Sequence, residues 1–357
     1  MRQSVRSGLA ALLVFGVSSM ALAQQTPTGT GKAAAPATRP AGPALTKEQQ
    51  AKLNEPLATV NGEKITRAQF LTLISQYPIP PGSEQSAYTT GIDLLINTRL
   101  LTQFLQQNRV PADTAEIDKI IDEQRKSFTE NGTSLEAALA DSNTTIDQMR
   151  ETIKTTLQWR EFVKKTATDS TLKAYMEANK DVFNGTQVRA SHIQLNLEPT
   201  ATAAQKAAAK EKLLKIKKEV ESGTIGFADA ANKYSEDPSN KEQPSGGDLR
   251  WFPRKVFSEP FSAAAFSLPK GKISDPVETE YGMHLIQVTD RKDGGPVQFE
   301  RFREKILNQY AVDEQNRIVA EMRKKAKIEI KPMPSDLFAA KPADAAPKAK
   351  DAAPKAK

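Results

Sequence analysis

The hydrophobic pattern of this 357-residue chain changes twice, and these changes constrain the fold more than any other feature. As far as Asn179 the apolar residues recur mainly at helical spacing. From Gln187 to Arg291 short apolar strands alternate with helices, and from Phe299 the pattern is helical again. Because helical segments flank the mixed segment on both sides, we predict an α+β protein. A strand-containing domain is inserted in an all-helical domain that the last helix completes.

Turn and capping residues divide the chain further. Leu57–Val60 is β-prone and ends at Asn61-Gly62, a dipeptide that tolerates positive φ, and Thr66 is a suitable N-cap for a helix beginning at Arg67. Further helices are predicted over Asp93–Asn108, Ala115–Phe128, Thr145–Lys165 and Thr171–Asn179. The mixed segment predicts strands at Gln187–Leu197, Leu249–Phe252 and Met283–Thr289, helices at Thr202–Glu221, Phe227–Tyr234 and Pro260–Phe266, and then the helix Phe299–Lys327. The predicted domains are residues 56–182 with 297–330, and residues 187–291.

The N-terminal residues predict export. Arg2 and Arg6 precede an apolar run, Leu9–Val17, and the small-residue stop Ala21-Leu22-Ala23 completes a secretory signal of residues 1–23. No later segment is apolar enough to cross a bilayer, so we expect a periplasmic or secreted protein without an integral membrane segment after cleavage. The chain has no cysteine, which excludes disulfides, a cysteine nucleophile and a lipidated cysteine.

The two ends of the mature chain are of low complexity. Residues 24–55 are predicted to be a disordered linker, and residues 331–357, which contain DAAPKAK twice, a disordered spacer whose deletion is neutral. The formal charge is +7, but residues 49–330 carry no net charge. A neutral body with basic ends argues against a nucleic-acid partner. Contact between the basic tail and anionic envelope components remains open.

Polar residues of the mixed segment predict a buried cluster. His192 lies in VRASHIQL, His284 lies in YGMHLIQV, and Asp237 and Thr279 fall between them with Ser235 nearby. A Ser-His-Asp hydrolase, a zinc site and two satisfied core histidines are all conceivable. Neither Ser235 nor Ser245 lies in a G-x-S-x-G elbow, and no closely spaced histidine pair suggests a metal.

Three motifs within Gln187–Arg291 resemble those of parvulin-type peptidyl-prolyl isomerases. SEDPSNKEQPSGGDLRWF (residues 235–252) resembles the signature loop of that family, ASHIQL its first histidine strand, and ETEYGMHLIQV its last strand. PFSAAAFSLPKGKISDPV, which precedes that last strand, is similar to the third helix and following strand. The resemblance implies a four-stranded antiparallel sheet wrapped by about four helices, and a non-covalent isomerase without metal or cofactor.

The resemblance also implies roles for individual residues. It assigns His192, Asp237, Thr279 and His284 to the catalytic network and Leu249, Phe257 and Phe261 to the seat of the substrate proline. Arg250, Gln194 and Met283 depart from the family pattern; Arg250 stands where glycine is usual, and Arg250 and Met283 are candidate modulators. The arginine cluster of phosphate-reading members is absent. Lys206, Lys210 and Lys212 are interpreted as a solvated face.

The flanking segments resemble exported foldases of the SurA and PrsA type. The matching segments are LATVNGEKITRAQFLTLI, TLKAYMEANKDVF and the closing FERFREKILNQ. This resemblance implies that the helical domain holds unfolded exported polypeptides. Two functions follow: an isomerase that also holds clients, or a chaperone whose parvulin-like domain binds without catalysing.

Overall fold

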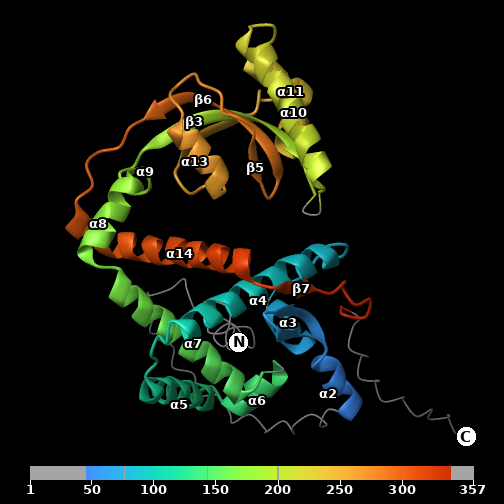
Figure 1. Cartoon of the computed structure of the whole chain (residues 1–357), viewed down its shortest axis with the longest axis vertical. Helices are drawn as coiled ribbons and strands as arrows, with labels where there is room; N and C mark the ends of the chain where they lie inside the picture. The colour runs from blue at the N-terminus through green and yellow to red at the C-terminus, as the bar shows by residue number, and fades with distance from the viewer. Residues whose placement is uncertain (1–45, 76, 143, 199–200, 339–357) are drawn as a thin grey trace, which may run out of the picture. The chain divides into compact units, whose positions relative to one another are not determined.

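The computed structural model describes residues 46–338 except residues 76, 143, 199 and 200. The signal sequence, most of the linker and the DAAPKAK repeat lie outside the described residues. The chain forms two compact units (Figure 1). We call them the first unit (residues up to Thr168 and from Asn308) and, after the resemblance described above, the isomerase unit (Asp169–Leu307). No helix in the described part of the chain is both long and apolar enough to cross a membrane.

Helices make up most of the first unit, and side-chain caps fix where several of them begin. The Thr66 hydroxyl accepts a hydrogen bond from the Gln69 N–H while the Gln69 side chain accepts one from the Thr66 N–H, as predicted for this N-cap. Thr145 caps its helix in the same way. The helices that lie in this unit are α2 (Lys47–Leu53), α3 (Arg67–Ile74), α4 (Glu84–Gln107), α5 (Thr114–Glu130), α6 (Leu135–Asp141) and α7 (Ile146–Thr166), and the boundary between the units falls inside α14 (Phe299–Lys325).

The first unit also contains a three-stranded antiparallel sheet, so the α+β class is confirmed but this domain is not all-helical. The strand order is β2 (Glu63–Thr66), β1 (Pro56–Val60), β7 (Ile328–Ile330). Asn61 and Gly62 form the β1–β2 turn with φ of 52° and 84°, the positive values expected of this dipeptide. Only the strand at Leu57–Val60 was predicted; β2 and β7 were not, because strands of four and three residues have too few positions for alternation to be recognised.

The segment just after β7 is ordered, which corrects the predicted spacer. We call residues 331–338 the C-terminal clasp. The Lys331 N–H donates to the Leu57 carbonyl at 2.9 Å, and its carbonyl accepts from the Tyr88 hydroxyl at 2.8 Å. Leu337 is buried, and the ring of Phe338 meets that of Phe70 edge-on at 6.0 Å. The linker is likewise shorter than predicted, because α2 occupies part of it.

A charged side chain of the clasp reaches into the first unit. Asp336 accepts from the buried Arg67 guanidinium at 2.7 Å and pairs with Lys52. These two partners hold the pKa of the Asp336 carboxyl well below its ordinary range. Asp336 therefore joins the clasp to α2 and α3.

The isomerase unit is built on a four-stranded antiparallel sheet, the architecture that the resemblance implied. Its strand order is β4 (Asp248–Pro253), β3 (Gln187–Asn196), β6 (Gly282–Lys292), β5 (Val277–Thr279). The helices α8 (Asp169–Ala178) and α9 (Lys180–Phe183), which the sequence analysis assigned to the helical domain, belong to this unit. The other helices are α10 (Ala203–Glu221), α11 (Phe227–Tyr234), α12 (Pro238–Glu242) and α13 (Glu259–Ser267).

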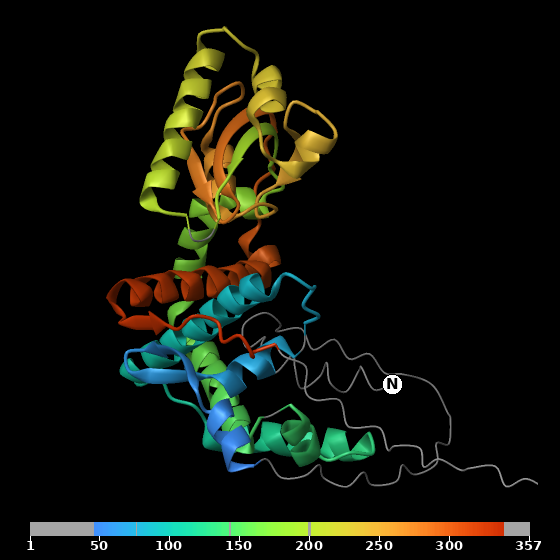
Figure 2. The same ribbon diagram turned by 90° about the vertical axis from the view of Figure 1, so that its right-hand side faces the viewer.

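The two faces of this sheet pack against different helices (Figure 2). One face forms a core with α10 and α11 that includes Ile193, Leu195, Met283 and Leu285. The other packs against α13 with Val188, Ala190, Ile286 and Val288. Successive strand residues point to opposite faces, so His192 and His284 lie on the α13 face.

Candidate active site

The register of β3 and β6 brings the two histidines together. His192 is opposite Ile286 and Gln194 is opposite His284, so the imidazoles are diagonal neighbours on one face. Their ring centroids are 5.6 Å apart with an interplanar angle of 13°, and the two Nδ1 atoms are 3.4 Å apart. Both side chains are buried. Adjacent strands therefore hold the pair in place without any contribution from a mobile loop.

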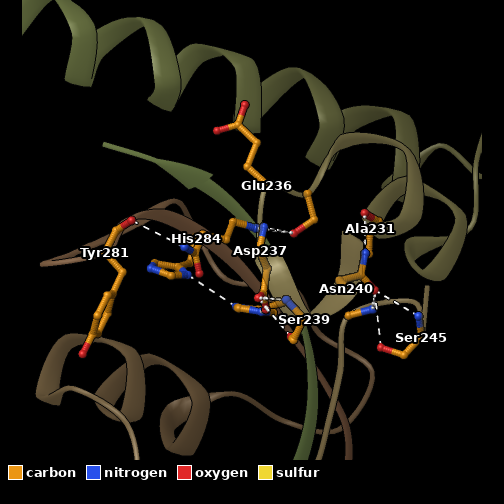
Figure 3. A network of polar contacts seen from close by, with 12 residues as sticks. Ala231, Glu236, Asp237, Ser239, Asn240, Ser245, Tyr281 and His284 are labelled. Carbon is orange, nitrogen blue, oxygen red and sulfur yellow. Dashed lines mark hydrogen bonds and ion pairs between the residues drawn. The ribbon is translucent and has the colours of Figure 1, made fainter. Parts of the chain in front are cut away.

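Asp237 reaches the pair from the loop between α11 and α12. Its Oδ2 lies 2.7 Å from His192 Nε2, and its Oδ1 accepts from the Ser239 N–H at 2.9 Å as the cap of α12 (Figure 3). The hydroxyl oxygen of Ser235 accepts hydrogen bonds from the N–H of Gln194 and, at 3.4 Å, from that of Asp237. Ser235 thus ties the loop to β3. These contacts do not form the Ser-His-Asp triad considered as an alternative.

Thr279 lies at the other end of the network, on β5. Its Oγ1 is 2.7 Å from His284 Nε2 and accepts from the Tyr281 N–H at 3.1 Å. With Asp237 ionised, one direction of donation satisfies every atom: Thr279 donates to His284 Nε2, His284 Nδ1–H to His192 Nδ1, and His192 Nε2–H to Asp237. The four predicted catalytic residues therefore form one continuous chain.

The pKa values favour this protonation pattern. Burial lowers the pKa of His192, although Asp237 opposes the effect. Burial, together with the neighbouring His192, lowers the pKa of His284 to about 4. Burial raises the pKa of Asp237, but hydrogen bonds from His192 and Ser239 outweigh it and leave that pKa below its ordinary value. At neutral pH the site therefore holds two neutral imidazoles and one carboxylate.

An apolar surface borders the histidines. The ring of Phe261 is buried and meets both imidazoles edge-on, with centroid distances of 5.8 Å to His192 and 5.5 Å to His284. Phe257 packs against Phe261 at 5.0 Å, and both Phe257 and Leu249 are partly buried beside the same core. The structure thus brings the three residues predicted to seat proline into one cluster next to the polar chain.

The two candidate modulators have different environments. Met283 is buried in the α10–α11 core, on the opposite face of the sheet from His284, and does not reach the site. Adjacent residues of a strand must face opposite ways, and this alternation excludes a direct role. Arg250 is exposed, with φ of 59°, in the left-handed region where a glycine would be unstrained.

The residues missed by sequence reasoning form a support around Asp237. The Asn240 side chain is buried; its oxygen accepts from the N–H groups of Ser245 and Gly247, and its nitrogen donates to the Ala231 carbonyl (Figure 3). The Gly247 carbonyl in turn accepts from the His192 N–H at 3.0 Å. Gly247 has φ of 71°, and a Cβ there would lie 2.1 Å from the His192 carbonyl oxygen. The adjacent glycines, noted in the sequence only as a turn, were the available signal.

Two lysines of the α10 face that was interpreted as solvated pair with acids next to the catalytic residues. Lys206 lies 2.7 Å from Glu278, and Lys212 lies 3.9 Å from Glu236. These pairs are exposed and contribute little stability. In the described ranges, no group of three or more potential metal-ligating side chains is arranged to hold an ion.

Comparison with known proteins identifies the isomerase unit. Residues 170–292 match the family described as the PPIC-type PPIase domain. The chaperone SurA of Photorhabdus laumondii subsp. laumondii is 40% identical over 107 residues, which cover 30% of this chain and 24% of that protein. This second match covers little of the chain, so it bears on a single domain.

Similarity to PrsA extends over more of the chain. The crystal structure of PrsA from Bacillus anthracis is 22% identical, covers 65% of this chain and 94% of that one, and has a TM-score of 0.41. The foldase protein PrsA of Bacillus subtilis is 31% identical over 247 residues, which are 68% of this chain and 77% of that protein. The chain therefore belongs to the PrsA family of foldases and carries a PPIC-type peptidyl-prolyl cis-trans isomerase domain.

Proposed function

We propose that His192, Asp237, Thr279 and His284 accelerate rotation about X-Pro bonds in unfolded exported polypeptides, with Leu249, Phe257 and Phe261 as the proline seat. The single observation that carries this assignment is the unbroken hydrogen-bonded chain from Thr279 to Asp237 beside the ring of Phe261. A polar chain bordered by an aromatic surface suits an amide flanked by an apolar ring.

The chemistry requires no bond to be broken. The barrier of about 18–20 kcal/mol arises from the double-bond character of the amide C–N bond. A site lowers it by binding the twisted amide more tightly than the planar one. The apolar seat removes the proline ring from water, and the fixed dipoles of the polar chain border the turned amide without reorganising.

The neutral state of the two imidazoles supports this mechanism. An imidazolium would donate strongly to the oxygen of a planar amide, which carries the larger negative charge, and would stabilise the ground state. Burial prevents this by lowering the pKa of both histidines. Asp237 accepts from His192 and caps α12, so its role is to orient and polarise the pair.

The experiment is NMR measurement of cis-trans exchange in X-Pro peptides. We expect Asp237→Ala to lower the catalysed rate about a hundredfold. Asp237→Asn keeps a good N-cap and should retain the fold, with part of the rate lost through the missing charge. Asp275→Ala removes an exposed carboxylate of the same unit and should match the wild type. Wild-type exchange in Asp237→Ala would remove Asp237 from the mechanism, and a wild type that accelerates exchange in no peptide would leave a binding module that does not catalyse.

Phe261→Ala suits this test less well than the sequence suggested. The side chain is 3% exposed within the core beside α13, and its removal costs about 3–5 kcal/mol of stability. Phe257→Ala truncates the partly exposed end of the same seat, and should lower exchange with a smaller loss of stability.

Client holding belongs to the first unit in this proposal. A groove of about 380 Å³ there has a mixed lining, in which Tyr88, Ile92, Ile330, Pro332 and Met333 lie beside the polar residues Gln85, Thr89, Asp93 and Lys331. Extended client segments match this lining. Suppression of client aggregation, followed by light scattering, should persist in Asp237→Ala. Its loss together with isomerisation would assign both functions to the isomerase unit.

Export to the periplasm is part of the same proposal. It is supported by the predicted signal of residues 1–23 and by relatives named as foldases and chaperones. Contact of the basic residues beyond Phe338 with anionic envelope components is proposed from their charge alone.

A further inference from the structure

Large exposed hydrophobic side chains occur in both units, and two of them are close in sequence to residues of the active site. Within the described residues of the isomerase unit they are Leu214 on α10, Val256 and Tyr281. Val256 directly precedes Phe257 of the proposed proline seat, and Tyr281 lies two residues after Thr279. Tyr281 is 64% exposed, the largest value of the three. Two of the three therefore adjoin site residues in the sequence.

The turn that carries Tyr281 is fixed by its backbone. The Tyr281 N–H donates to Thr279 Oγ1 at 3.1 Å, and its carbonyl accepts from Gln194 Nε2 at 3.5 Å. The next residue, Gly282, packs so tightly on β3 that a Cβ would lie 2.1 Å from the Leu195 carbonyl oxygen. A ring on a fixed turn loses little freedom when it binds a ligand.

The ring itself is left without a partner in the described part of the molecule. No ring contact or side-chain hydrogen bond engages it there, and Figure 3 shows it extending away from the polar network. The path from the proline seat to Tyr281 is short: Phe261 meets His284, His284 bonds Thr279, and Thr279 bonds the Tyr281 backbone. An extended chain advances about 3.3–3.6 Å per residue. A residue close to the substrate proline can therefore lie over this ring.

The charges around Tyr281 indicate which kind of substrate residue could lie over its ring. Glu280 precedes it, and Glu278 is paired with Lys206. An acidic substrate residue would meet these carboxylates, whereas a large apolar side chain would bury against the ring. Such side chains are mostly hidden in folded proteins and exposed in unfolded ones.

We propose that Tyr281 is a specificity residue that selects X-Pro segments carrying an aromatic or large aliphatic residue next to the proline. The proposal rests on the isomerase function assigned above. Tyr281 gives the enzyme a preference for chains that have not yet buried their apolar residues.

The test compares two peptides that differ only in having Phe or Ala before proline, by NMR exchange with the full-length protein. We expect wild-type kcat/KM to be higher for the Phe peptide. Tyr281→Ser should reduce the Phe-to-Ala ratio of kcat/KM about five- to tenfold, the loss of one aromatic contact. Tyr281→Phe keeps the ring and should keep the ratio. Leu214→Ser removes another exposed hydrophobic side chain of this unit, on α10, and should change neither rate.

The possible failures are distinguishable. An equal fall for both peptides in Tyr281→Ser would leave the ratio intact and overturn the proposal, since Tyr281 would then act only through Thr279. An unchanged ratio with unchanged rates would overturn it as well. Exchange absent from the wild type for every peptide would reject the catalytic assignment itself, and with it this inference.

Discussion

Buried polar residues are arranged differently in the two units. In the isomerase unit His192, His284, Ser235 and Asn240 are buried and surround Asp237 and the glycine loop. In the first unit the buried polar side chains lie at separate places, although Gln103 also bonds the side chains of Asn61 and Glu63. Gln103 donates to the Val60 carbonyl, Gln158 donates to the Val110 carbonyl, and Arg67 pairs with Asp336.

This difference distinguishes buried polar side chains that hold the fold together from those that form a site. A buried polar group costs free energy unless it is hydrogen-bonded. The buried polar contacts of the first unit join neighbouring segments, and in the described residues Arg67 Nε is left without a partner. The isomerase unit has a continuous chain of buried and partly buried polar groups that ends beside a partly exposed apolar surface. Such a chain is more than hydrogen-bond satisfaction requires.

The strongest test of the structural half of this comparison is truncation. Ending the chain after Ile330 removes the clasp and exposes the side chains that Leu337 and Phe338 cover. It also leaves Glu55, at 3.6 Å, as the remaining ion-pair partner of the buried Arg67 among the described residues. We expect the first unit to lose about 4 kcal/mol of unfolding free energy in urea, while exchange catalysis on short peptides persists.

Ending the chain after Phe338 is the matched control, since it keeps every clasp residue and should be neutral. Equal stability of the two truncated proteins would show that the clasp contributes nothing. Loss of catalysis with the clasp would instead couple the two units.

Acid should weaken the isomerase unit before the first unit. The unfolded chain protonates His284 near its ordinary pKa of about 6.5, whereas the folded chain does so only near 4. Between these values the unfolded state binds more protons, so stability falls as the pH is lowered through this window, by about 3 kcal/mol, and levels off below it. The lowered pKa of His192 acts in the same direction.

Hydrogen exchange of backbone amides resolves the two units. Both histidines of the chain lie in the isomerase unit, so amides of α7 should keep their protection between pH 6.5 and 5 while those of β6 lose part of theirs. Constant protection in β6 would contradict buried, neutral imidazoles.

The smallest expected effect is at Arg250. Its left-handed backbone is strained for any residue with a Cβ, so Arg250→Gly should stabilise the isomerase unit by about 1 kcal/mol. Because the side chain is exposed, we expect peptide exchange to change less than twofold. A tenfold change in either direction, measured by NMR, would assign the guanidinium to substrate binding.

Sequence reasoning located most helices and the major strands because their patterns are long. Phe227–Tyr234 was predicted with its observed bounds, and Thr66 and Thr202 cap helices as capping boxes. The strand β7 was missed because three residues carry no periodicity, and the clasp was missed because its sequence was interpreted as part of the disordered tail. Their partners in β1 and α3 lie more than 260 positions away in the sequence.

The site could be predicted to a similar extent. The resemblance named the residues of the hydrogen-bonded chain, but only the register of β3 and β6 determines that the imidazoles meet through their Nδ1 atoms. Met283 could have been excluded from the sequence, because it precedes His284 in a strand. Asn240 could not have been found, since its partners include two backbone N–H groups of a loop whose path only the fold determines.

The pairing of β1 with β7 has a consequence for the order of assembly. Every strand of the isomerase sheet has been synthesised once Lys292 is made, but the first unit lacks its third strand until Ile328–Ile330 follows. During synthesis from the N-terminus, the inserted domain can therefore mature while the domain around it is still open. The part of this foldase that is made first is the part that closes last.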